Sequence, residues 1–135
     1  MHNLTFEKLI FYDAGEKGIT VDVKIQLSET STIFPAKIDT GSEACIFRRV
    51  HGEKIGIEIE NGEPQRFGTP TGSFLTYGHW VTLTVENFQI DSYVFFAADE
   101  NFTRNVLGRR GWLDRMIVGI NDYDGKLYLS RYESE

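Results

Sequence analysis

The residues best suited to chemistry follow the apolar segment 33–38 and are Asp39, Thr40, Gly41 and Ser42. They put a carboxylate, two hydroxyl groups and a flexible glycine at the end of a predicted strand. Two carboxylates in one site can divide acid and base roles, because one keeps a proton while the other stays ionised. The sequence has this motif once. Such chemistry therefore needs two chains at one site, or it does not occur.

A predicted hairpin positions Asp39. Residues 19–27 alternate apolar and polar side chains, which is typical of a half-buried strand. Residues 28–31 are expected to turn the chain, and residues 33–38 to form the returning strand. Asp39 then lies where that second strand ends.

The rest of the chain also favours short strands with glycine-rich turns, which predicts one all-β domain over residues 1–135. The only expected helix is a short one at 111–116, and residues 4–12 are expected to form an extra strand or arm. Further strands are predicted at 55–59, 80–85 and 90–98, and a closing hairpin pairs 117–120 with 126–129.

A second motif, the segment 105–109 with the sequence Asn-Val-Leu-Gly-Arg, lies downstream, and a glycine-flanked hairpin at 68–78 lies between the two motifs. This order resembles the retropepsin-like aspartic proteases, and the continuation to Asp114 and Arg115 is similar to their bacterial branch. The resemblance covers residues 19–130. It implies a small closed acid-protease barrel with one short helix, and a homodimer with its active site between the chains.

The resemblance also implies roles for the first motif. Asp39 would be the catalytic carboxylate, and the hydroxyl of Thr40 would bond across the two-fold axis to the partner loop. Gly41 would let the substrate backbone approach closely. Ser42 would donate a hydrogen bond to Asp39, which would stabilise the anion and favour an acid-leaning optimum of activity.

The neighbouring residues would support that site. Glu43 would pair with Arg109 and brace the active-site loop, although a solvated Glu43 is the competing interpretation. Gly108 would lie where the two loops cross. Ile46 and Val106 would line substrate subsites, and either could equally be part of the core.

The hairpin 68–78 would be a flap over the cleft that opens for substrate and closes to exclude water. Gly72 and Ser73 near its tip would face the peptide, and Phe74 and Tyr77 could contact it. The alternative is an ordinary hairpin whose aromatic side chains pack in the core.

Charge argues against nucleic acid as the default partner, because the formal net charge is −6. A nucleic-acid-binding β domain would have to depend on a local cluster of four arginines, which we interpret instead as members of structural ion pairs. These arginines are Arg104, Arg109, Arg110 and Arg115.

The remaining reactive side chains predict no cofactor and no metal. The three histidines have no metal-ligand spacing and are expected to be solvated or in turns. Cys45 is the single cysteine, which excludes an intrachain disulfide and fits a core position. Trp80 and Trp112 are also expected in the core.

No segment resembles a signal peptide, and none approaches the ~18 apolar residues that span a bilayer. We therefore expect no membrane partner and a cytoplasmic location.

The expected function is an aspartic endopeptidase that hydrolyses peptide or protein substrates between two Asp39 carboxylates of a homodimer. The apolar subsites suggest hydrophobic side chains flanking the scissile bond. The alternative is a non-catalytic dimerisation or peptide-binding module that keeps the protease fold.

Overall fold

The structure is a computed structural model that describes residues 1–133. In this range the chain forms ten strands, one α-helix and two 3₁₀ turns. The strands are β1 (Lys8–Phe11), β2 (Thr20–Leu27), β3 (Thr30–Ile38), β4 (Ile46–Phe47), β5 (Glu63–Thr69), β6 (Gly72–Val85), β7 (Phe88–Ala97), β8 (Val106–Leu107), β9 (Met116–Asn121) and β10 (Lys126–Arg131). The helical elements are α1 (Arg49–Lys54), η1 (Ile59–Asn61) and η2 (Leu113–Arg115).

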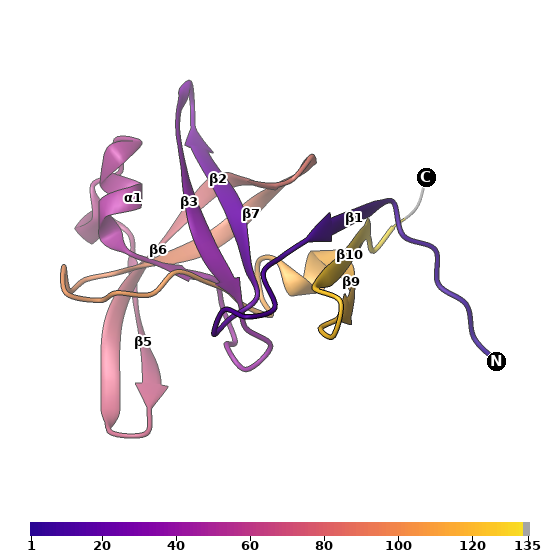
Figure 1. The fold of residues 1–135 in the computed structure, drawn as a ribbon. Helices are drawn as coiled ribbons and strands as arrows, with labels where there is room; N and C mark the ends of the chain where they lie inside the picture. Colours follow the sequence, from indigo (N-terminus) through magenta and orange to yellow (C-terminus); the bar gives the residue numbers. More distant parts are fainter. Residues whose placement is uncertain (134–135) are drawn as a thin grey trace.

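The strands form two sheets, which confirms the all-β class. The larger sheet has the order β2-β3-β8-β4-β7-β6-β5, and an added β2–β6 pairing closes its path. It is not a strict barrel, because β4 and β8 contribute two residues each and β5 lies outside the closed path. Figure 1 shows the β5–β6 hairpin projecting on one side and the smaller sheet β1-β10-β9 on the other.

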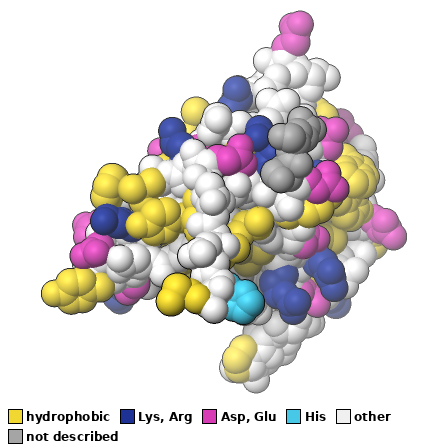
Figure 2. Space-filling view, turned by 90° about the vertical axis from the view of Figure 1, so that its right-hand side faces the viewer, with side chains coloured by type: hydrophobic (Ala, Val, Ile, Leu, Met, Phe, Trp, Pro, Cys, Tyr) yellow, Lys and Arg dark blue, Asp and Glu magenta, His cyan; other side chains and the backbone are white. Residues whose placement is uncertain are grey.

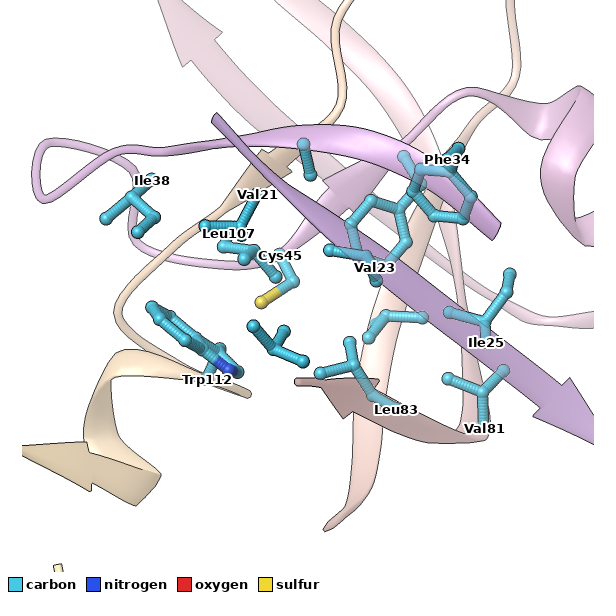
Figure 3. Close-up of a cluster of buried hydrophobic side chains, with 14 of the residues drawn as sticks. Val21, Val23, Ile25, Phe34, Ile38, Cys45, Val81, Leu83, Leu107 and Trp112 are labelled. Carbon is cyan, nitrogen blue, oxygen red and sulfur yellow. The ribbon is translucent and has the colours of Figure 1, made fainter. Parts of the chain in front are cut away.

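The core lies inside the closed path of strands. Val21, Val23 and Ile25 of β2 are buried, while Asp22 between them is exposed. The period-two prediction for this strand is therefore confirmed. Figure 3 shows these side chains meeting others from β3, β6 and β8, with the Cys45 sulfur between Leu107 and Trp112.

The strand predicted at 55–59 is wrong. Helix α1 ends just before it and η1 begins within it, and Gly56 has a φ of +89°, which an extended strand does not allow. The apolar alternation still reflects burial, because Ile55, Ile57 and Ile59 all enter the core. Alternating burial in an irregular segment imitates the strand pattern.

Helix α1 was missed because its stability comes from tertiary contacts. It has a glycine inside it and no side-chain N-cap. A Cβ added to Gly52 would lie 2.8 Å from Ile59 and 3.0 Å from Phe96, so the glycine permits close packing. Arg49 forms ion pairs with Glu53 at 3.3 Å and with Glu60 at 2.6 Å. The helix predicted at 111–116 is only the single 3₁₀ turn η2.

The two tryptophans differ from each other. Trp112 is buried as expected, but Trp80 is 66% exposed on β6, so its predicted core position is wrong. Its ring lies 5.3 Å from that of Tyr93 on the outer face of the sheet. The strand alternation places Val81 and Leu83 inside, which turns Trp80 outward.

The expected extra strand near the N-terminus is β1, which pairs antiparallel with β10. The Glu7 carboxylate anchors it by accepting hydrogen bonds from the Ser130 hydroxyl at 2.9 Å and the Arg131 amide at 3.0 Å. Among residues 1–133, β1 and β9 are the unpaired edges of this sheet. Over the same residues, no helix is long and apolar enough to cross a membrane.

His51 is buried within α1, so the expectation of a solvated or turn histidine is wrong for this residue. Its ring stacks on Phe34 with centroids 4.0 Å apart. Nε2 lies 3.4 Å from the amide nitrogen of Asn105, and Nδ1 has no hydrogen-bond partner among the described residues. Burial, reinforced by the charges of Lys54 and Arg48, lowers the pKa of His51 to about 4.

This burial predicts acid sensitivity of the fold. The unfolded chain protonates His51 near pH 6.5, whereas the folded chain does so only near pH 4, so the stabilisation is fully present above about 6.5 and is lost as the pH falls toward 4. The free energy of unfolding should drop by about 3 kcal/mol across this window. In urea denaturation, His51→Phe should lack this contribution to the fall in the free energy of unfolding with pH. The matched variant His2→Phe, at an exposed position, should keep the wild-type pH dependence, and equal slopes for His51→Phe and wild type would contradict the assignment.

Candidate active site

Asp39 is held at the end of β3 by the strand beside it. Strands β3 and β8 pair in parallel, with Lys37 opposite Val106 and Ile38 opposite Leu107. The Asp39 amide then donates to the Leu107 carbonyl at 3.0 Å. The Asp39 Oδ1 accepts a hydrogen bond from the Gly41 amide at 2.9 Å. Hydrogen bonds thus fix both the backbone and the side chain of Asp39.

The loop after Asp39 crosses the loop after β8, as the resemblance implied for Gly108. The Arg109 amide donates to the Ser42 carbonyl and the Arg110 amide to the Glu43 carbonyl, both at 2.9 Å. A Cβ on Gly108 would lie 2.1 Å from the Ala44 carbonyl oxygen. Only glycine permits this crossing, because the obstructing atom belongs to the backbone.

The expected hydrogen bond from Ser42 to Asp39 is absent. The Ser42 hydroxyl donates instead to the Ala44 carbonyl at 2.8 Å. A serine side chain can satisfy a backbone group two residues away, and this local contact takes the hydroxyl proton. The expectation that Ser42 produces an acid-leaning optimum therefore loses its structural basis in the single chain.

The expected ion pair between Glu43 and Arg109 is also absent, and both side chains are exposed. The active-site loop is braced by the two backbone hydrogen bonds described above rather than by charge. The competing interpretation, a solvated Glu43, is the one that fits.

A cleft of about 380 Å³ opens beside Asp39. It brings together most of the residues that the resemblance implied, including Ile46 and Val106, whose side chains are buried in its wall. Thr40 is exposed and lies outside this lining. The cleft is lined by Asp39, Gly41, Ser42, Glu43, Ile46, Phe67, Gly68, Thr69, Pro70, Phe74, Phe102, Arg104 and Val106.

The predicted flap is the β5–β6 hairpin, which is longer than residues 68–78 and turns at Pro70 and Thr71. Phe67 and Phe74 are cross-strand partners on the side that faces the cleft. Gly72 and Ser73 are exposed and do not line the cleft.

Tyr77 packs against the core instead of lining the cleft, so its predicted substrate contact is wrong. It is three residues from Phe74, and side chains at odd spacing point to opposite faces of a strand.

Sequence reasoning identified Phe74 but missed Phe67 and Phe102, which complete the aromatic wall of the cleft. Phe74 stacks on Phe102 with centroids 5.0 Å apart, and Phe67 lies 5.1 Å from Phe95. Phe102 precedes β8 in an irregular segment, where no periodicity could identify it. Its position only three residues before Asn105 of the second motif was the one available signal.

The arginine cluster does not form the expected ion pairs. Among the described residues, none of its four members lies within 4.0 Å of an acidic side chain. Arg115 donates to the Asp91 carbonyl at 3.3 Å, and the Arg104 guanidinium lies 6.0 Å from the centre of the Phe102 ring. Arg109 and Arg110 are exposed. Figure 2 shows basic and acidic side chains interspersed over the face of the molecule that carries the smaller sheet.

Two other kinds of reactive centre, a cysteine nucleophile and a metal site, find no support among residues 1–133. Cys45 is fully buried, and this burial raises the pKa of its thiol to about 12, which keeps it protonated and inert. Within residues 1–133, no group of three or more His, Cys, Asp or Glu side chains is placed to hold a metal ion.

The comparisons with known proteins give the fold. No family model matches the sequence, and no curated protein matches it. A retropepsin-like aspartic protease from Rickettsia conorii is similar in structure, with a TM-score of 0.63, 14% identity and coverage of 96% of both chains. The EIAV protease, solved in complex with the inhibitor HBY-793, has a TM-score of 0.56, 21% identity and coverage of 74% of this chain and 88% of its own. The chain therefore has the retropepsin-like fold.

The loop crossing can be tested with a pair of glycine variants. Gly108→Ala should lower the free energy of unfolding by about 3 kcal/mol, because the methyl group overlaps a backbone carbonyl that cannot move alone. Gly68→Ala, in the flap, should change it by less than about 1 kcal/mol, since nothing lies within 4 Å of its added Cβ. Chemical denaturation measures both variants. Equal stability of the two would contradict the close approach at Gly108.

Proposed function

We propose that two copies of this chain form an aspartic endopeptidase. The observation that carries the proposal is the placement of Asp39, which is fixed between β3 and β8 beside a cleft whose wall includes the flap hairpin. The retropepsin-like fold supports it, because the Asp-Thr-Gly motif, the flap and the glycine crossing occur in the expected order along the chain.

The chemistry needs a second Asp39 from the partner chain. Two such carboxylates held about 3 Å apart cannot both ionise and would share one proton. The ionised Asp39 acts as general base on a water molecule held between them, and the protonated one donates to the scissile carbonyl. The water attacks the carbonyl carbon directly, so no covalent enzyme intermediate forms.

The cleft suits an extended peptide. Its aromatic and aliphatic walls, from Phe67, Phe74, Phe102, Ile46 and Val106, offer apolar contacts to side chains near the scissile bond. The flap tip at 70–72 is exposed and forms the turn between β5 and β6, so it can swing open and close over substrate.

Dimerisation would bring the two Asp39 loops together. Thr40 directly follows Asp39 and is exposed, as a residue that contacts a partner loop must be. The edges of β1 and β9 are available for strand addition by a second copy. The alternative, a non-catalytic dimerisation or peptide-binding module, shares every one of these contacts and differs only in lacking turnover.

Cleavage should depend on Asp39. Asp39→Asn keeps the shape of the side chain but removes the base, so cleavage of a diverse peptide library should fall by about 10³-fold or more. The exposed Asp22→Asn on β2 should cleave as wild type does. Mass spectrometry of the products measures both variants. A folded, dimeric wild-type chain that cleaves nothing would favour the binding module, and equal cleavage by Asp39→Asn would reveal a contaminating protease.

A further inference from the structure

A second recess of about 290 Å³ lies next to the cleft, on the side away from Glu43. The two hollows share Arg104 and Val106 in their walls, so they adjoin at this end. Glu43 and Phe67 instead mark the other end of the cleft, where they also line a third hollow beside Trp80. Arg104 therefore stands between the cleft and the second recess.

The charged residues that line this second recess are Lys37 and Arg104, and both are basic. We call it the basic recess. Neither side chain lies within 4.0 Å of an acidic group among residues 1–133. Two unneutralised cations at one small hollow stand out in a chain whose net charge is −6.

Local packing restrains both side chains. The stem of Lys37 covers Gly18, where an added Cβ would lie 2.9 Å from Cδ and 2.8 Å from Cε. The Arg104 guanidinium lies 6.0 Å from the centre of the Phe102 ring, at the distance of a cation–π contact. Partly ordered cations lose less conformational freedom on meeting an anion than free ones would.

The basic recess lies close to the catalytic position along the chain. Lys37 precedes Asp39 by two residues on β3, and Val106, its parallel partner on β8, lines both hollows. A peptide side chain that leaves the cleft past Val106 would therefore meet Lys37 and Arg104 within a residue or so of the scissile bond.

We propose that the basic recess binds a carboxylate side chain of the substrate, so that the protein selects peptides with glutamate or aspartate beside the apolar residues held in the cleft. The apolar walls alone would suggest hydrophobic neighbours on both sides of the scissile bond. Arg104 and Lys37 would instead favour an acidic residue at one of those two positions. For cleavage, this inference rests on the proposed function, but the binding preference does not need turnover.

The test uses a peptide library in which every variable position carries Glu and Gln equally, because these side chains have the same size and differ in charge. The library is captured at pH 6.5 on immobilised Asp39→Asn protein, which binds without cutting. Wild-type cleavage products of the same library are sequenced in parallel. Glu should exceed Gln by roughly tenfold at one position next to an apolar residue, as expected for a charge-assisted hydrogen bond.

Variants test whether the basic recess causes the preference for Glu over Gln. In the Asp39→Asn background, Arg104→Gln and Lys37→Gln should each reduce the ratio of Glu to Gln several-fold, and Arg104→Lys should restore much of it. Lys54→Gln removes an equal charge from the exposed end of α1 and should leave the ratio unchanged.

The outcomes separate this inference from the proposed function. Cleavage with equal recovery of Glu and Gln would overturn the acidic preference while leaving the protease intact. Capture that favours Glu and depends on Arg104, with no cleavage by wild type, would support carboxylate binding at the basic recess and contradict the proposed endopeptidase activity. Equal capture of Glu and Gln by the binding form would overturn the inference whether or not cleavage occurs.

Discussion

The site depends on the parallel pairing of β3 with β8 and on the loop crossing that follows it. These two strands are separated by the whole flap in sequence, yet their pairing fixes the backbone of Asp39 through Leu107. The crossing at Gly108 then locks the Asp39 loop by two backbone hydrogen bonds. Holding two long, flexible side chains in an exposed ion pair costs conformational entropy, and backbone hydrogen bonds avoid that cost. The loop is therefore braced without a Glu43–Arg109 ion pair.

The same pairing organises the cleft. Val106 sits on β8 between the cleft and the basic recess, and Ile46 on β4 lies opposite it. Phe102 and Arg104 come just before β8 in the sequence. Strand β8, which pairs with β3 and fixes Asp39, therefore also positions an aromatic side chain and a cation. The proposed chemistry of the carboxylate and the proposed selection of substrate thus both depend on one short strand of two residues.

Local sequence patterns predicted the parts of this arrangement that local physics controls. The alternation in β2 and the motif at Asp39 identified the hairpin. The crossing at Gly108 is a long-range contact, and it was expected from the resemblance rather than from local physics. The patterns failed where distant contacts decide the outcome. Helix α1 is held by Phe96 and Glu60, and Tyr77 follows a flap register that pairing with β5 fixes. Ser42 is a different case, because its hydroxyl donates to the nearby Ala44 carbonyl, and the sequence did not rank this local acceptor above the Asp39 carboxylate.

The central claim is that one active site contains Asp39 from each of two chains, and a mixing experiment tests it most directly. Wild-type protein is incubated with increasing Asp39→Asn chain until subunits exchange, and cleavage per wild-type chain is measured. With a ninefold excess of the variant, activity should fall to about one tenth, because only wild-type homodimers carry two carboxylates able to share a proton. Activity per wild-type chain that stays constant at every ratio, with exchange verified, would contradict the account.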